Sequence, residues 1–329
     1  MRNSICFRLF ILIALAGSIM PACNQNDHKK GAVENPLFRL VDPNQCKITF
    51  ANQLVETDSA NAIFYEYYYN GAGLAIGDLN NDGLSDIVFG ANMTQSRVYL
   101  NNGNLSFSDI TKQTGINTSG KWITGVSLVD INHDGWLDIY LCAAGNINYD
   151  YHNLLYVSNG NKDNLAFTEC AEAVGLNDNG YSSQAEFLDY DRDGDLDMYL
   201  VTAALTIPNK NALRPRKNDG SMINTDRLYR NDGINPLTGL PLFHNVSKEA
   251  GITWDGFGLG VAICDINSDG WPDIYVGNDY ISNDLLYVNQ RNGTFREMIK
   301  DYTKHISNST MGVDIADFKV SAAASDNLV

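Results

Sequence analysis

A nineteen-residue pattern recurs four times along this 329-residue chain, and it constrains the fold more than any other feature. The first copy reads AGLAIGDLNNDGLSDIVFG, and every copy joins two apolar runs through a loop rich in Asp, Asn and Gly. The loops begin at Asp78, Asp130, Asp189 and Asp265, with separations of 52, 59 and 76 residues. Repetition on this scale predicts a fold built from one supersecondary unit used several times.

A second pattern follows each copy, at residues 97–116, 154–176, 227–252 and 285–302. It starts with an apolar run such as RVYL, turns at Asn and Gly, and resumes with a strand led by Phe. Each unit therefore holds four predicted strands in about fifty residues, which is the size of a propeller blade. We predict an all-β fold, a β-propeller with four complete blades and a partial fifth. Whether the ring is complete stays open.

The third unit is longer than the others because of residues 206–226. We expect this stretch to be a surface insertion, with its basic cluster from Arg214 to Lys217 in solvent.

Near the C-terminus, Met311–Val320 begins like a fifth unit, and Asp317 falls 52 residues after Asp265. The rest of that loop does not follow. We interpret residues 318–329 as an aberrant or truncated tail, and a natural capping tail is the alternative.

The loops carry oxygen side chains at positions 1, 3, 5 and 9, and a Gly at position 6. Hard oxygen ligands at alternate positions around a sharp turn are typical of Ca²⁺ sites. By analogy with other such loops, the carbonyl of position 7 is expected to complete the shell. The predicted ligands are Asp78, Asn80, Asp82, Leu84 and Asp86; Asp130, Asn132, Asp134, Trp136 and Asp138; Asp189, Asp191, Asp193, Asp195 and Asp197; Asp265, Asn267, Asp269, Trp271 and Asp273.

These loops are not EF-hands, because position 12 is apolar instead of Glu and the flanks are strand-like. A single copy is also compatible with an Asx-rich turn that binds no metal. Four copies in register favour Ca²⁺, and Mg²⁺ is the minor alternative because it dehydrates reluctantly. The predicted role of the ions is structural.

The N-terminus predicts export. Basic residues precede the apolar run Leu9–Met20, which is too short to span a bilayer, and MPAC ends at Cys23. We predict a lipoprotein signal peptide over residues 1–22, lipidation of Cys23 and a polar tether over residues 23–36, with anchoring to the bacterial outer membrane or cell surface. An ordinary signal peptide with an incidental Cys is the alternative.

Charge and cysteine usage exclude some functions. The chain has 39 acidic and 23 basic residues, a net charge of −16, which argues against nucleic-acid binding. Cys46, Cys142, Cys170 and Cys264 lack the spacing of a zinc site. Cys142 and Cys264 are expected to be buried thiols, although a disulfide is compatible with export.

The repeated D-x-N-x-D-G-x-x-D motif, with its trailing LY-x-N turn, resembles FG-GAP/VCBS repeats, which form the integrin-α-like β-propeller. The lead-in YEYYYNGAGLAIGDLNNDG looks like that of lipid-anchored VCBS-repeat proteins of Bacteroidetes type, related to the cartilage acidic protein family. The resemblance covers about residues 37–317. It implies a propeller that usually has seven blades. Larger members add an ASPIC/UnbV module, which we do not expect in residues 318–329.

We therefore predict a calcium-stabilised, envelope-anchored binding or scaffolding protein without catalytic activity, whose ligand is a glycan or another envelope protein. The aromatic run Tyr65–Tyr69 is a candidate contact, but packing within a strand explains it more simply. One alternative is a hydrolase or lyase acting on polysaccharide or lipid. Glu186 or Asp279 are its candidate acids, yet the chain has no G-x-S-x-G, H-E-x-x-H or P-loop motif. A second alternative is a fragment without function of its own.

Overall fold

The computed structural model describes residues 38–144, 149–204 and 215–316. The chain divides into a short unit ending at Val41 and a larger unit from Asp42 onward, and the description below concerns the larger unit. The predicted signal peptide, Cys23, the tether and residues 317–329 lie outside the described residues. No helix among the described residues is long and apolar enough to cross a membrane.

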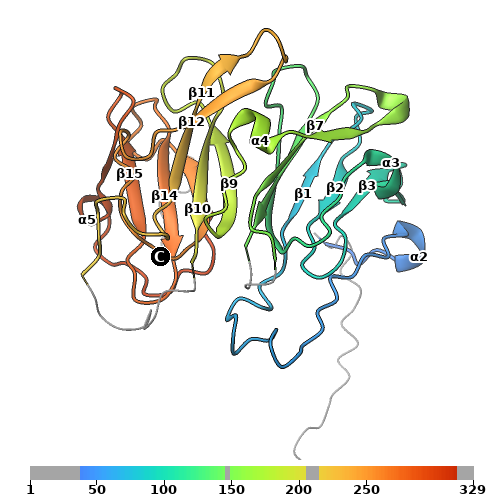
Figure 1. The fold of residues 1–329 in the computed structure, drawn as a ribbon, viewed down its shortest axis with the longest axis horizontal. Coiled ribbons are helices and arrows are strands. Elements are labelled where there is room, and N and C mark those ends of the chain that lie inside the picture. Colours follow the sequence, from blue (N-terminus) through green and yellow to red (C-terminus); the bar gives the residue numbers. More distant parts are fainter. Residues whose placement is uncertain (1–37, 145–148, 205–214, 317–329) are drawn as a thin grey trace, which may run out of the picture. The chain divides into compact units, whose positions relative to one another are not determined.

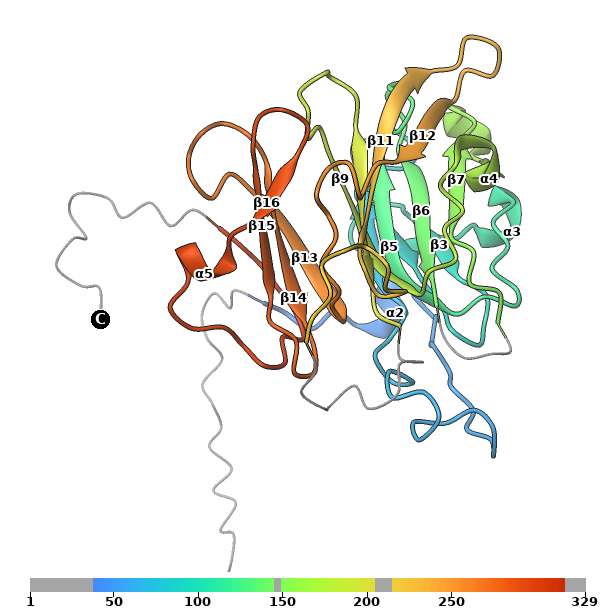
Figure 2. The ribbon, with the colours of Figure 1, turned by 60° about the vertical axis from the view of Figure 1, so that its left-hand side comes forward.

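Four antiparallel sheets of four strands form the fold, and each sheet uses four consecutive strands (Figures 1 and 2). The first sheet contains β1 (Leu74–Gly77), β2 (Asp86–Phe89), β3 (Arg97–Asn101) and β4 (Phe107–Asp109), and the second contains β5 (Ile123–Val129), β6 (Asp138–Ala143), β7 (Leu154–Ser158) and β8 (Phe167–Glu169). The third contains β9 (Ser182–Leu188), β10 (Asp197–Thr202), β11 (Arg227–Ile234) and β12 (Pro241–Asn245), and the fourth contains β13 (Gly258–Cys264), β14 (Asp273–Asn278), β15 (Leu285–Asn289) and β16 (Phe295–Glu297). The predicted four-stranded units are confirmed.

The acidic loop sits at the same place in every sheet, between the first and second strands. In each case the Asp at position 9 pairs with the residue just before position 1, as in Gly77 with Asp86 and Val129 with Asp138. Leu188 with Asp197 and Cys264 with Asp273 repeat this register. The loop therefore closes over one end of the first two strands, and its geometry follows from their pairing.

The sheets pack in chain order through their first strands, with β5 against β1, β9 against β5 and β13 against β9. Three buried apolar clusters fill the spaces between neighbouring sheets. The first two sheets share one around Leu141 and Val88, the second and third share one around Tyr140 and Met198, and the third and fourth share one around Tyr199 and Tyr287. Face-to-face burial between consecutive sheets is what a propeller requires.

Glycine permits close approach between the first strands of neighbouring sheets. A Cβ on Gly73 would lie 3.1 Å from the Cα of Gly125, and one on Gly125 would lie 2.6 Å from the carbonyl oxygen of Ser183. Gly260 repeats this arrangement, because a Cβ there would lie 3.1 Å from the backbone nitrogen of Val313. Residues 311–313 thus lie against β13 as the start of a fifth unit would, as predicted, although residues 311–316 form no strand.

The short helices are connectors. They are α2 (Pro43–Cys46), α3 (Thr111–Thr114), α4 (Ala171–Val174), α5 (Ile299–Tyr302) and the 3₁₀ turn η1 (Lys162–Asn164).

Two expectations were wrong. Tyr65–Tyr69 forms turns and no strand, but Tyr65, Tyr67 and Tyr68 are buried as packing predicts. Arg216 is not a solvated cation, because its guanidinium lies 5.6 Å from the centre of the Trp254 ring and donates to the Asn283 carbonyl. Arg214 lies outside the described residues.

Candidate metal centre

The four acidic loops share one backbone conformation. Position 4 adopts a left-handed φ in each loop, between 54° and 62°, and the Gly at position 6 has φ between 85° and 98°. Only Gly adopts the second conformation without steric cost, which explains its presence in every copy. The two left-handed residues curl the chain so that the side chains of positions 1, 3 and 5 converge.

Position 1 holds the turn together. The N–H groups of Asp82 and Gly83 donate to the Asp78 carboxylate at 3.0 and 2.7 Å. Asp130 and Asp265 accept the same pair of bonds in the second and fourth loops. A carboxylate that accepts backbone N–H bonds has a fixed orientation, and its remaining lone pairs stay available to a cation.

Positions 3 and 5 face one another. The Asn80 side-chain amide donates to Asp82 at 3.0 Å, and Asn132 and Asn267 make the equivalent bonds at 3.0 and 2.9 Å. The position-5 carboxylate also accepts the N–H of position 7 in all four loops, at 2.8 to 2.9 Å. The structure thus brings together the predicted side chains of positions 1, 3 and 5.

Position 9 lies deeper than the other positions. Asp86, Asp138, Asp197 and Asp273 are all 0 % exposed. Each accepts one N–H from position 2 and one from the third strand of its sheet, as Asp86 does from Leu79 and Asn101, both at 2.8 Å. Burial raises the pKa of Asp86 to about 6, of Asp138 to about 7 and of Asp197 to about 8, although the two N–H bonds oppose this shift. The same cause raises the pKa of Asp273.

The third loop has the most complete set of carboxylates. It has Asp instead of Asn at position 3, and it adds Asp195 at position 7. Carboxylate oxygens of Asp189, Asp191 and Asp197 all lie within 4.8 Å of one another. One buried oxygen of Asp189 and one of Asp191 have no hydrogen-bond partner. Buried carboxylate oxygens without a donor are costly, so these residues fit a hard cation such as Ca²⁺.

The fourth loop carries its own cation. Arg291 donates from Nε and Nη2 to the same oxygen of Asp269, at 3.0 and 2.9 Å. Arg291 has φ 61°, and the equivalent residues in the other sheets are Gly103, Gly160 and Gly233, all at positive φ. Although partial desolvation acts in the other direction, the Trp271 N–H and Arg291 lower the pKa of Asp269. The Arg291 guanidinium thus contacts the position-5 carboxylate that a bound metal ion would use as a ligand.

The loops also contact one another, which the sequence did not reveal. In each case position 4 of one loop reaches position 6 or 7 of the next. The Asn81 amide donates to the Gly135 carbonyl at 3.0 Å, His133 lies 3.8 Å from Asp195, and the Arg192 guanidinium lies 4.8 Å from the centre of the Trp271 ring. Varied residue types at position 4 hid this pattern, and only its fixed place in the repeat could have indicated it.

The remaining predicted residues are the position-7 carbonyl ligands, the cysteines and the two candidate acids. The carbonyl ligands of position 7, on Leu84, Trp136, Asp195 and Trp271, stay a prediction. Cys46, Cys142, Cys170 and Cys264 are free thiols, and Cys264 is only half-buried. Glu186 accepts from Gln184 at 2.7 Å, and Asp279 accepts from Tyr67 at 2.8 Å.

Comparison with known families agrees with this geometry. The model of the FG-GAP-like repeat matches residues 78–141 and 265–319, which include the first, second and fourth loops. The third loop, outside both matches, is the one with extra carboxylates at positions 3 and 7.

Distant relatives are similar over parts of their length. Cartilage acidic protein 1 of Xenopus tropicalis is 24% identical over 212 residues, which is 64% of this chain and 29% of the relative. The mouse protein of the same name is 24% identical over 67% of this chain and 33% of its own length. Human integrin alpha-8 is 32% identical over 113 residues, 30% of this chain and 10% of the integrin. The chain thus spans about a third or less of these relatives. Residues 78–141 and 265–319 match the FG-GAP-like repeat, and the four sheets are four-stranded blades of a β-propeller.

Proposed function

We propose that this chain is a calcium-stabilised binding scaffold without catalytic activity, exported and anchored to the bacterial cell envelope by a lipid on Cys23. The observation that carries the calcium part is the third loop, where two buried carboxylate oxygens of Asp189 and Asp191 lack hydrogen-bond donors. Bound Ca²⁺ would supply a positive charge at the centre of each loop. The protein's own part is to orient the carboxylates through backbone N–H bonds and to shield position 9 from water.

The two carboxyl groups named as candidate acids are engaged in contacts with the protein. Glu186 and Asp279 each accept a hydrogen bond from a neighbouring protein group, and the recurrent Asp residues are used by the loops. Catalysis of hydrolysis or elimination needs an acid, a base or a nucleophile arranged around one point. A binding role therefore accounts for the fold better than an enzymatic one.

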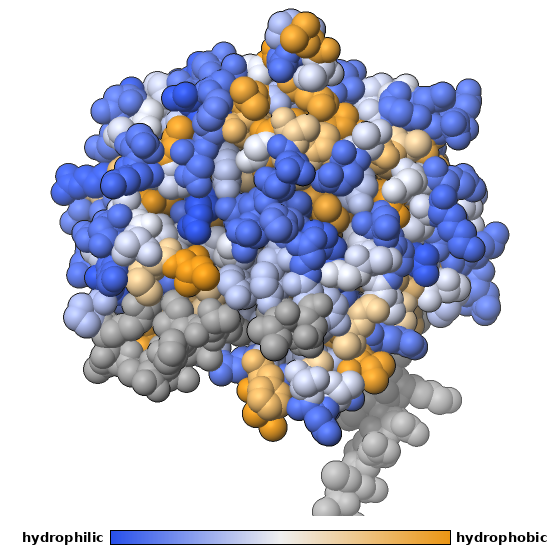
Figure 3. Space-filling model, viewed as in Figure 1, coloured by the Kyte–Doolittle hydropathy of each residue, from blue (hydrophilic) through white to orange (hydrophobic). Residues whose placement is uncertain are grey.

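The surface favours a polar ligand. The face drawn in Figure 3 is largely hydrophilic, and its hydrophobic residues occur in small scattered groups. Partners that bind through extensive apolar contact need a larger continuous patch than this face offers. A glycan or a polar envelope protein is the expected partner, and the negative net charge disfavours nucleic acid.

Direct metal analysis tests the calcium proposal. Purified protein at equilibrium in dialysis against about 1 mM Ca²⁺ should retain Ca²⁺ in excess of the dialysate, measurable by plasma emission spectroscopy. The double variant Asp189→Asn and Asp191→Asn should lose about one equivalent. Retention of no Ca²⁺ by the wild type would contradict the proposal.

Cell fractionation tests the anchoring proposal. The full-length chain should partition with membranes and be accessible to protease on intact cells, and Cys23→Ser should release it. Equal membrane association of both forms would contradict a lipid anchor.

A further inference from the structure

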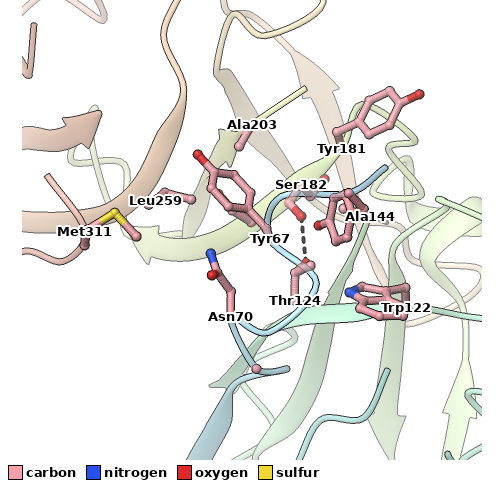
Figure 4. A pocket seen from close by; sticks show the side chains of 13 residues that line it. Tyr67, Asn70, Trp122, Thr124, Ala144, Tyr181, Ser182, Ala203, Leu259 and Met311 are labelled. Carbon is pink, nitrogen blue, oxygen red and sulfur yellow. Dashed lines mark hydrogen bonds between the residues drawn. The ribbon is translucent and has the colours of Figure 1, made fainter. Parts of the chain in front are cut away.

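A cavity of about 270 Å³ lies at the opposite end of the first strands from the acidic loops (Figure 4). Thr124 is the second residue of β5 and Ser183 the second of β9, whereas the loops follow the far ends of these strands. Strands of seven residues separate the two ends by roughly 20 Å. The cavity is therefore distinct from the metal loops.

The repeat itself builds the cavity wall. Thr124, Ser183, Leu259 and Met311 line it, and each stands six residues before the first Asp position of its unit. Equivalent backbone positions of successive units thus place different side chains around one space. Two are hydroxyl-bearing and two are apolar, so the cavity has a polar side and an apolar side.

Aromatic and amide groups complete the lining. Tyr67 and Trp122 come from outside the four equivalent positions, and Asn70 lies below Tyr67 in Figure 4. Among the residues that the structure describes, no charged side chain lines the cavity. An amphipathic lining without charge suits a neutral ligand that has both C–H and O–H faces.

The hydroxyl groups in and around this space already donate their hydrogens to the protein. Thr124 Oγ1 donates to the Ser182 carbonyl at 2.7 Å, drawn as the dashed line in Figure 4, and Ser183 Oγ donates to the Gly258 carbonyl at 2.8 Å. The Tyr67 hydroxyl donates to Asp279 at 2.8 Å. A hydroxyl has one hydrogen and two lone pairs, so these three oxygens can still accept. A ligand that brings donors is therefore complementary to these three oxygens.

These three oxygens disfavour anions. A phosphate or carboxylate offers only acceptors, and would find three acceptor oxygens with their hydrogens directed elsewhere. A ligand rich in hydroxyl groups can donate to those oxygens while its C–H face rests on Tyr67, Leu259 or Met311.

The backbone at the cavity is strained. Tyr181, which lines it, has φ 62°, a conformation that bulky residues rarely adopt. Its ring packs on Tyr151 with centroids 4.8 Å apart. Strain of this kind persists where the surroundings hold a residue for a purpose, and binding sites are a common place for it.

We propose that this cavity binds one neutral sugar ring, as the terminal unit of a glycan. The proposal rests on the proposed binding function and specifies its ligand class. A cavity of this size, slightly below that of drug-sized sites, is suited to a single ring.

A quaternary ammonium ion is the main competing ligand, because aromatic side chains surround such cations. Trp122 is only 1 % exposed and Tyr65 only 7 %. Tyr65 meets the Trp122 ring edge-on at 5.7 Å, and Tyr68 lies 5.1 Å from it. These rings are used in packing against one another and do not form an open cage.

Ligand-observed saturation-transfer NMR with a panel of neutral methyl glycosides tests the proposal, on the calcium-loaded chain from Asn24 to Val329. At least one glycoside should bind, and Thr124→Val and Ser183→Ala should each weaken it about fivefold, the effect of one lost hydrogen bond. Met311→Trp should abolish binding, because Met311 is 60 % exposed at the cavity and a larger ring there fills it without disturbing the core.

Ser127→Ala is the matched control. Ser127 lies on the same strand and donates to the Ala185 carbonyl at 2.6 Å, the same kind of contact between sheets, outside the cavity. It should leave glycoside affinity unchanged. The proposal is overturned if no glycoside binds, if Ser127→Ala weakens binding as much as Thr124→Val, or if tetramethylammonium competes with the sugar.

The same samples separate this proposal from the wider one. If no glycoside binds while the protein still retains Ca²⁺, the cavity assignment fails and the calcium scaffold stands. If glycoside binds but no Ca²⁺ is retained, the sugar site stands and the calcium part of the proposed function fails.

Discussion

Arg291 is the residue at which one blade departs from the other three. Its left-handed backbone replaces a Gly, and its guanidinium holds the position-5 carboxylate of the fourth loop. We expect Arg291→Gly to relieve the strain and to remove a competitor for Asp269. Calcium affinity of the fourth loop should rise up to about fivefold, the range of an exposed ion pair. Calorimetric titration measures it, with Arg296→Gly as the exposed control, and an unchanged affinity would show that Arg291 does not compete.

Asp226 is a buried carboxyl group remote from the loops in sequence. It accepts from the Thr202 N–H at 2.8 Å and from the Tyr199 hydroxyl at 2.9 Å, and it is 2 % exposed. Burial raises its pKa to about 6, partly opposed by these bonds. The folded state therefore favours the protonated acid.

The pH dependence of stability follows from that shift. The contribution of Asp226 is fully present below the unfolded pKa of about 4, falls as pH rises to about 6, and then stays level, a loss of up to about 3 kcal/mol. The free energy of urea unfolding is measured in chelator for wild type and Asp226→Asn. The wild type should lose stability relative to the variant as pH rises from about 4 to about 6. The difference between wild type and the exposed Asp301→Asn should stay constant over this window. A constant difference between wild type and Asp226→Asn would contradict the assignment.

Within one loop, positions 5 and 9 have different tasks. Asp134 is exposed, whereas Asp138 is buried and accepts the Ile131 and Ser158 N–H groups at 3.1 and 2.8 Å. Asp138→Ala should lower the free energy of unfolding by about 2–4 kcal/mol with or without Ca²⁺, because it strands two buried donors. Asp134→Ala should do so mainly when Ca²⁺ is present. Equal losses for both variants in chelator would contradict this division.

Between loops, the contact of Arg192 with Trp271 joins the third blade to the fourth. The guanidinium lies 4.8 Å from the ring centre, and it also approaches the Gly270 backbone. A double-mutant cycle of Arg192→Ala and Trp271→Ala should give a coupling energy of about 0.5–1 kcal/mol. The same cycle with Arg192→Ala and the distant Trp122→Phe should give none, and zero coupling for the first pair would show that the loops act independently.

The elements that could be predicted from the sequence are those that the repeat specifies locally. Alternating apolar runs around a Gly-bearing acidic loop predicted β1, β2 and their equivalents, and the structure confirms the four sheets. The convergence of Asp78, Asn80 and Asp82 also followed from their spacing. The burial of the position-9 carboxyl group could not be predicted, because nothing in the local sequence distinguishes position 9 from position 5 as a buried position.

Features that depend on contacts between units could not be predicted. Arg216 reads as a solvated cation until its stacking on Trp254 is seen. Tyr65–Tyr69 has the composition of a strand, yet its rings fill a space near Trp122 and Ala203 that only the assembled sheets create. The cavity of Figure 4 is likewise invisible in one unit, since residues from several units line it together.

At the scale of the molecule, four acidic loops concentrate negative charge at one end of the four first strands. Without bound cations, each position-9 carboxyl group either stays protonated or carries a desolvated negative charge that costs free energy, as the raised pKa values indicate. Extracellular calcium modules often bind with dissociation constants of about 10⁻⁴ M, so each site at millimolar Ca²⁺ would add about 1–2 kcal/mol. Several sites together would be comparable to the net stability of a domain.

Thermal unfolding of residues 24–329 with Ca²⁺, with Mg²⁺ and with chelator tests the central claim most directly. We predict one cooperative transition whose midpoint rises with millimolar Ca²⁺, rises little with Mg²⁺ and falls in chelator. The double variant Asp189→Asn and Asp191→Asn should lose part of the calcium-dependent rise. A cooperative transition with the same midpoint in Ca²⁺ and in chelator would contradict the assignment of the acidic loops as calcium sites.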